Sequence, residues 1–277
     1  MCPASRKAIT RAASPALLVH LRFTTVGCTM SGHSKWATIK HKKGATDAKR
    51  GKLFSKLIKE LTVAARMGGG EPTNNARLRK AIWDAKQQSM PGDTIKNAVK
   101  RGTGEMEGAA YEDVLYEGTG PGGTLFLVEG QTDNRNRTVA EIRKIFERSS
   151  GNLGGAGVAA WGFDRKGFIT IDKAAANEDQ LMEIAVGSGA EDYTDEDDVW
   201  TVTTPPEALL TVLDALEKAS ILTKESQLGY IPKTRKQATG KDAEQLLHLV
   251  EVLDDHDDVA NVFADFDISD EELANLS

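Results

Sequence analysis

The sequence predicts an α+β protein, with an N-terminal three-helix domain followed by two α/β-sandwich (ferredoxin-like) domains, one inserted in the other. In the N-terminal third, apolar residues recur at three- and four-residue intervals, which is typical of amphipathic helices. From Tyr111 onward, short strand-like segments are interspersed with helical ones, without a long parallel series. The two strands and one helix expected at 111–150 are incomplete as a sandwich, so the last helix and strand are expected to complete it.

These patterns predict domain boundaries. Residues 30–104 form the basic helical domain, 105–155 together with 237–277 form a discontinuous α+β domain, and 156–236 form the inserted α+β domain. Residues 1–29 lie outside the fold. They contain four basic and no acidic residues, with a short apolar stretch, and resemble an organellar transit peptide. The interpretation we favour is an upstream start codon, with the native chain beginning at Met30.

The helices of the N-terminal domain are predicted from their apolar residues and end signals. Cations, Lys52 and Lys59 among them, occupy the other faces of the first helix, which ends at 68–70. Asn74 or Asn75 is expected to cap the second helix, and Asp93 the third. The apolar positions of the first helix are Leu53, Phe54, Leu57, Ile58, Leu61 and Ala65.

Two strands, 111–116 and 124–129, are expected to form a hairpin through the glycine-rich loop Gly118–Gly123. No Lys and no helix follows this loop, which argues against a phosphate-binding loop. In the next helix, Thr138 and Glu141 are expected to form a capping box. The remaining predicted elements are a hairpin at 158–171 turning at 164–167, a helix near 178–185, strands within 191–203, a helix opened by Thr204-Pro205-Pro206-Glu207, a strand around 225–230, a helix bearing Leu246 to Leu253, and a strand at 259–266.

Charge is distributed unevenly along the chain. Residues 30–104 carry 17 Lys/Arg and 5 Asp/Glu, whereas 105–277 carry 14 and 36, within an overall net charge of -6. A phosphate backbone is bound mainly by Lys and Arg that displace its counterions. The basic domain is therefore predicted to bind nucleic acid.

The predicted binding residues lie in a basic arm and the start of the first helix. Cations bind phosphate, and the indole of Trp36 can stack on an unpaired base. The alternative is that the arm is solvated and Trp36 packs on the helical domain. No sequence-reading motif is present, so DNA and RNA both stay open as targets. The predicted contacts are His33, Lys35, Trp36, Lys40, His41, Lys42, Lys43, Lys49, Arg50 and Lys52.

A candidate second contact is formed by Arg135 and Arg137, within Asp133–Thr138. Two arginines beside a helix N-terminus oppose its dipole, which indicates a role for them. They either present guanidinium groups to phosphate or pair with carboxylates of the acidic domains. The sequence does not decide between the two.

Several kinds of chemistry are disfavoured. Both cysteines, Cys2 and Cys28, precede Met30, so the rest of the chain has no thiol for a disulfide, metal site or nucleophile. The acidic clusters at 192–198 and 254–258 lack calcium-loop spacing and are interpreted as solvated turns. His248 and His256 have no metal-ligand spacing. We therefore predict a binding protein without cofactor or metal; a metal-dependent nuclease using the acidic clusters is the disfavoured enzyme alternative.

Five motifs in order resemble the YebC/PmpR family from Met30 to nearly Ser277. They are 30–36, 47–52, 68–70, Tyr116-Glu117-Gly118 with 120–123, and 133–138. The resemblance implies a nested three-domain fold and a transcriptional regulator of the bacterial cytoplasm that binds DNA. Organellar targeting by residues 1–29 is the alternative location. One departure is Val158, where relatives more often have Ser.

Relatives also imply an alternative function, a translation factor that associates with ribosomal RNA and relieves stalling on proline-rich peptides. The partner is then the ribosome instead of promoter DNA. Neither interpretation requires a membrane or a small-molecule substrate.

Overall fold

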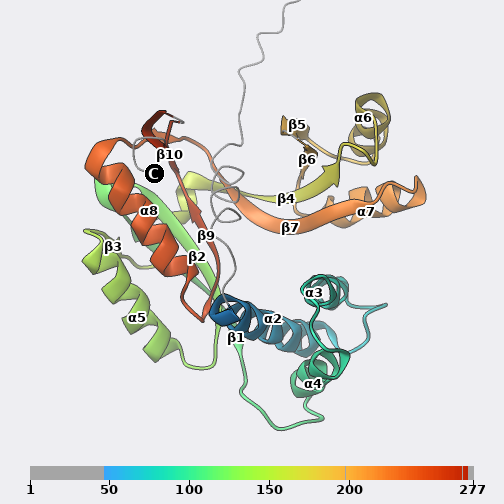
Figure 1. Ribbon diagram of the computed structural model, residues 1–277, viewed down its shortest axis with the longest axis horizontal. Helices are drawn as coiled ribbons and strands as arrows, with labels where there is room; N and C mark the ends of the chain where they lie inside the picture. Colours follow the sequence, from blue (N-terminus) through green and yellow to red (C-terminus); the bar gives the residue numbers. More distant parts are fainter. Residues whose placement is uncertain (1–46, 197, 270, 274–277) are drawn as a thin grey trace, which may run out of the picture.

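The computed structural model describes residues 47–196, 198–269 and 271–273 (Figure 1). The N-terminal domain consists of α2 (Asp47–Gly68), α3 (Ala76–Gln87) and α4 (Gly92–Thr103). Its core is small and consists of Leu61, Ala64, Ala65, Leu78, Ala81, Ala85, Met90, Ile95 and Ala98.

Asn75 caps α3 and also bonds the end of α2, which confirms the predicted cap of the second helix. Its side-chain oxygen accepts from the N–H of Leu78 at 3.0 Å, and its amide donates to the carbonyls of Ala64 and Gly69. The predicted cap at Asp93 is wrong, because α4 already begins at Gly92 and no side chain caps it. Pro91 precedes that helix and sets its first turn.

The second domain is an antiparallel sheet in the order β3-β1-β2-β9, with a short parallel pair β8-β10. Helices α5 and α8 cover one face, where β2 contributes Phe126 and Val128 to their shared core. The alternate residues Leu125 and Leu127 point to the other face. The elements are β1 (Glu112–Thr119), η1 (Pro121–Gly123), β2 (Leu125–Thr132), α5 (Arg135–Arg148), β3 (Asn152–Leu153), β8 (Lys236–Gln237), α8 (Gly240–Asp254), β9 (Val259–Ala264) and β10 (Phe266–Asp267).

Between β3 and β8 the chain forms a complete β-α-β-β-α-β unit with sheet order β5-β6-β4-β7, the ferredoxin-like arrangement. Strands β1, β2 and β3 before this unit and β9 after it form one sheet, that of the second domain, so the nested α+β fold is confirmed. The elements are η2 (Ala160–Gly162), β4 (Phe163–Asp172), α6 (Glu178–Gly187), β5 (Asp192–Glu196), β6 (Val199–Thr204), α7 (Leu209–Lys218) and β7 (Thr223–Pro232). The exact domain boundaries stay a prediction.

The hairpin predicted at 158–171 is wrong. The segment is one strand, β4, that pairs with β6 on one side and β7 on the other. The expected turn at 164–167 lies inside these ladders, where Gly167 is opposite both Thr204 and Leu228. Pairing on both sides satisfies the backbone groups of β4 and outweighs the local turn tendency of the sequence.

The capping box predicted at Thr138 and Glu141 and the helix start predicted at Thr204 are also wrong. Helix α5 begins three residues before Thr138, and the side chain of Asn134 accepts from the N–H of Arg137. Thr138 is buried in the first turns of the helix and bonds Thr132 and Asp258 instead. Thr204 is taken up by β6, and α7 begins only at Leu209.

The loop after β3 is shaped by the buried carboxylate of Glu117. It accepts from the N–H groups of Gly157, Ala159 and Ala160 at 2.7–2.8 Å. Burial raises the pKa of the Glu117 carboxyl, but these three bonds outweigh burial and lower the pKa from its usual value. The loop holds Trp161, whose indole N–H donates to the carbonyl of Val158. Glu117, part of the motif Tyr116-Glu117-Gly118, therefore has a structural role in this loop.

Glu117→Gln is expected to lower the free energy of unfolding by about 1–3 kcal/mol, because an amide can satisfy fewer of the three buried N–H donors. Urea unfolding of the two proteins at neutral pH measures the difference. Glu112→Gln, on the same strand but exposed, serves as control and should change stability by less than about 0.5 kcal/mol. Equal effects of the two substitutions would contradict the role assigned to Glu117.

Candidate nucleic-acid interface

Most of the predicted binding arm lies outside the described residues. These positions are His33, Lys35, Trp36, Lys40, His41, Lys42 and Lys43. Lys49 and Arg50 belong to the first turn of α2, and their side chains are likewise outside the description. Lys52 is the one predicted arm residue whose side-chain contacts are described.

Lys52 is paired with a carboxylate of the second domain. It belongs to a row of three lysines on α2 whose ammonium groups all contact the loop between α8 and β9; Figure 1 shows the start of α2 beside this end of the sheet. We call this loop, residues 254–258, the acidic loop. Lys52 Nζ lies 2.6 Å from Asp255 Oδ2, Lys56 Nζ donates to the carbonyl of Asp254, and Lys59 Nζ lies 2.5 Å from Asp258 Oδ1. Because the three lysines are four and three residues apart, one face of α2 presents all of them.

The acidic loop is therefore an anchor for the N-terminal domain, and its interpretation as a solvated turn is wrong for Asp258, although Asp255 and Asp257 are exposed. Asp258 is only 5% exposed. Its carboxylate accepts from Lys59, from Thr138 Oγ1 at 2.7 Å and from Arg137 Nη2 at 2.8 Å. Burial raises the pKa of Asp258, but these three donors outweigh burial and hold its pKa well below the usual 3.8.

The two arginines of the candidate second contact lie in the first turn of α5. Arg137 bridges Asp133 and Asp258, at 2.9 and 2.8 Å, and Arg135 lies 2.8 Å from Glu112. These bonds correspond to the carboxylate-pairing alternative. They place Arg137 at the junction between the domains, and a contact with nucleic acid by either arginine stays a prediction.

A second ionic junction joins α3 to the sheet. The guanidinium of Arg77 contacts Glu60 of α2 at 2.7 Å and Asp113 of β1 at 2.6 Å. Such forked pairs fix both distance and orientation. With the lysines of α2, Arg77 therefore links the N-terminal domain to carboxylates of the second domain.

Six further cations of α2, α3 and α4 are exposed and have no carboxylate partner among the described residues. None of them is among the contacts predicted from the sequence, in which only their contribution to the regional charge was visible. They are Arg66, Arg79, Lys86, Lys96, Lys100 and Arg101. The structure thus separates the cations of the basic domain into those that are paired with carboxylates and those that have no carboxylate partner among the described residues.

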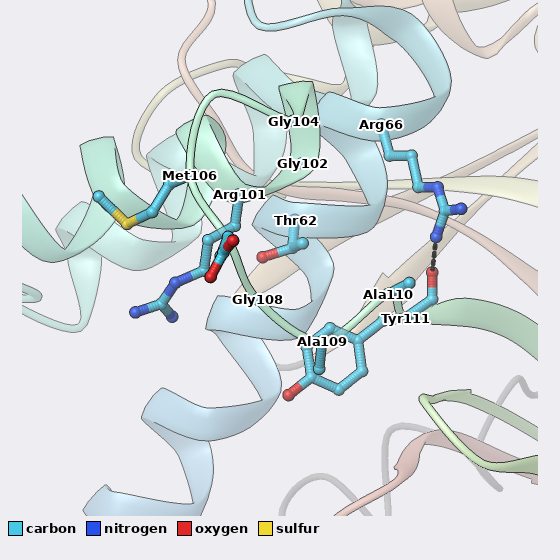
Figure 2. A pocket seen from close by; sticks show the side chains of 11 residues that line it. Thr62, Arg66, Arg101, Gly102, Gly104, Met106, Gly108, Ala109, Ala110 and Tyr111 are labelled. Carbon is cyan, nitrogen blue, oxygen red and sulfur yellow. Dashed lines mark hydrogen bonds between the residues drawn. The ribbon is translucent and has the colours of Figure 1, made fainter.

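Two of these six, Arg66 and Arg101, line a hollow of about 580 Å³ between α2, α4 and the following segment. Figure 2 shows the side chain of Thr62 between them, and a bond from Arg66 to the carbonyl of Tyr111. Gly102 lets the helices approach closely here, since a Cβ would lie 2.3 Å from the Thr62 carbonyl oxygen. The lining also includes the carboxylate of Glu107, so the hollow carries charges of both signs.

The remaining candidates take part in local contacts. His256 Nε2 lies 3.1 Å from Glu141, and its other ring nitrogen is placed to accept from the N–H of Asp258. In the other acidic cluster, Asp195 pairs with Lys173. Among the residues described, no group of three or more His, Cys, Asp and Glu is arranged to hold a metal ion. None of the described helices is long and apolar enough to cross a membrane.

Comparison with known proteins gives consistent matches over nearly the whole described chain. Residues 34–105 match the model of the TACO1/YebC protein N-terminal domain, and residues 111–266 match that of the TACO1/YebC second and third domain. The chain is 53% identical over 247 residues to a "Probable transcriptional regulatory protein" of Geobacter sulfurreducens, covering 89% of this chain and 100% of the relative. A protein of the same description from Desulforapulum autotrophicum is 53% identical over 242 residues, covering 87% and 98%.

A solved structure has the same fold. The crystal structure of a conserved hypothetical protein from Aquifex aeolicus superimposes with a TM-score of 0.77 at 43% sequence identity, covering 86% of this chain and 99% of that one. The resemblance found in the sequence motifs is therefore confirmed over the three domains.

Proposed function

Because the chain belongs to the TACO1/YebC family, we propose that it is a non-enzymatic regulatory protein that binds DNA through its basic N-terminal domain. The observation that carries the proposal is the set of six exposed cations without carboxylate partners among the described residues. The acidic domains, residues 105–277, carry 36 Asp and Glu residues. They contact three lysines of α2, but they leave these six cations without a carboxylate partner among the described residues. Binding of a polyanion to these six cations would replace no ion pair that the described residues form.

The remaining parts of the proposal follow from the same features. The basic arm extends the contact along the phosphate backbone, and neither a cofactor nor a metal is required, because phosphate recognition by Lys and Arg needs none. We place the protein in the bacterial cytoplasm, where its named relatives would regulate transcription. This is supported by their description as regulatory proteins.

A second candidate function is that of a translation factor bound to ribosomal RNA. The specific observation in its favour is Trp83 on α3, which is 41% exposed beside two of the six cations. Exposed aromatic side chains next to cations suit unpaired bases, which are commoner in folded RNA than in duplex DNA.

The deciding experiment is crosslinking of the protein in cells, followed by sequencing of the attached DNA and RNA in parallel. Recurrent promoter DNA over an RNA background would support the transcriptional regulator. Discrete ribosomal RNA sites would support the translation factor and would make any effect on transcription indirect. Recovery of neither above an unrelated acidic control protein would contradict nucleic-acid binding altogether.

Reversing two arm charges, Lys42→Glu with Lys43→Glu, is expected to weaken binding and to flatten its salt dependence. The slope of log affinity against log salt should fall by about 1 for each lost phosphate contact, hence by about 2. Fluorescence anisotropy with one labelled duplex at several salt concentrations measures both. Lys224→Glu with Lys241→Glu, on the acidic domains, is the matched control. If the arm variant kept both affinity and slope, the arm would not be part of the interface.

A further inference from the structure

Helix α3 has two distinct faces. Its core face carries Leu78, Ala81 and Ala85, all of them buried. The opposite face carries Arg79, Trp83 and Lys86, all of them exposed. The steps of four and three residues place these last three side chains in one row on the helix surface. The row is therefore a continuous surface of cation, indole and cation.

The environment of Trp83 differs from that of two other tryptophans. The indole N–H of Trp200 donates to the carbonyl of Ala176, and that of Trp161 donates to the carbonyl of Val158. The indole of Trp83 has no hydrogen bond or ring contact within the part of the chain that the structure describes. An indole is large and apolar, yet this one is 41% exposed and makes no internal hydrogen bond among the described residues.

The charges around Trp83 suit an anionic partner. Arg79 Nη1 donates to the carbonyls of Pro72 and Thr73, which holds the guanidinium beside the helix without neutralising it. The acidic residue next to Trp83, Asp84, is paired with Lys80 at 2.6 Å. The surface formed by Arg79, Trp83 and Lys86 therefore keeps a positive charge at both ends.

We propose that this surface of α3 binds unpaired bases of a single-stranded nucleic acid, with a base stacked on the indole of Trp83 and Arg79 and Lys86 on the adjoining phosphates. Every base has a π face, so stacking on an indole requires no particular sequence. In a duplex these faces are covered by the neighbouring base pairs, and only the phosphates remain for the cations. The inference rests on the proposed function, because it specifies which nucleic acid the basic domain holds.

The test compares Trp83→Ala with the unchanged full-length chain by fluorescence anisotropy on three labelled probes: a 12-nucleotide RNA, a DNA of the same sequence, and its DNA duplex. We expect Trp83→Ala to weaken binding to both single strands about 5- to 100-fold, the loss of one base–aromatic stack. Binding to the duplex should change less than about twofold. Trp83→Phe should retain most of the affinity, and Trp161→Ala, the matched control on a second exposed indole of the described residues, should retain all of it.

Each other outcome has a defined meaning. Unchanged affinity of Trp83→Ala for the single strands would overturn the α3 site but not the proposed function. An equal loss on all three probes would show that the indole contacts no unpaired base, and a loss on RNA alone would indicate a ribose contact instead of stacking. Binding of no probe by the unchanged chain would contradict the proposed function itself. If Trp83→Ala failed to fold by circular dichroism, Arg79→Gln with Lys86→Gln would replace it, with a loss on single strands expected and unchanged affinity contradictory.

Discussion

Replacing Asp258 with Ala is expected to destabilise the folded protein by about 3–5 kcal/mol, the usual cost of removing one partner of a buried ion pair. The carboxylate is 5% exposed and binds Lys59 and Arg137 together with the hydroxyl of Thr138. Without it, the ammonium group of Lys59, whose side chain is only 12% exposed, stays buried and lacks its counter-charge. The contact between the N-terminal and second domains should therefore loosen first.

Urea unfolding monitored by circular dichroism measures this change. Asp257→Ala is the matched control, because the neighbouring residue is exposed and contributes only its backbone carbonyl to Lys59. The control should alter the free energy of unfolding by less than about 0.5 kcal/mol. If the two variants were equally stable, the proposed anchor would not exist.

The same carboxylate predicts how stability depends on pH. The pKa of Asp258 is lowered in the folded protein, so its contribution is present above the usual value of 3.8 and is lost as pH falls toward the lower, folded value. The stability difference between the unchanged chain and Asp258→Asn should be constant above about pH 5 and shrink below about pH 4. A difference that grew on acidification would have the wrong sign for this group.

Phe146→Ala is the other substitution with a large expected effect, also about 3–5 kcal/mol, from lost burial and the cavity left behind. The ring is fully buried and lies edge-to-face with Phe126, at 5.7 Å between centroids. Backbone segments close around it, since a Cβ on Gly118 or on Gly151 would lie 2.7 or 3.1 Å from ring atoms. Because these close approaches fix the backbone, the site cannot collapse to fill the space.

Thermal unfolding followed by circular dichroism provides the measurement. Phe146→Leu, which keeps most of the volume, should cost clearly less than the alanine variant. A loss below about 1 kcal/mol for Phe146→Ala would mean that the core relaxes around the cavity. The ring would then not be the reason for glycine at 118 and 151.

The sequence alone determined the fold class, the nested order of the domains and the family. These follow from local signals, because apolar periodicity and end signals such as Asn75 act within a few residues. The five separated motifs, which occur in a fixed order, identify the family. Local signals failed where pairing partners compete with them. The turn expected at 164–167 is replaced by the pairing of β4 with β6 and β7. Thr138 bonds Asp258 instead of capping α5, and Thr204 belongs to β6 instead of opening α7.

Only the tertiary structure decided which charges are available. In the sequence, Lys59 and Lys86 are equivalent members of one basic region, yet the first lies against Asp258, about 200 positions away, and the second is exposed without a carboxylate partner among the described residues. Likewise, only the folded structure shows that the acidic loop holds the N-terminal domain and that Gly118 and Gly151 leave room for the ring of Phe146. Coulomb energy and steric contact depend on distance in space, and two elements far apart in the chain acquire that distance only when the whole molecule folds.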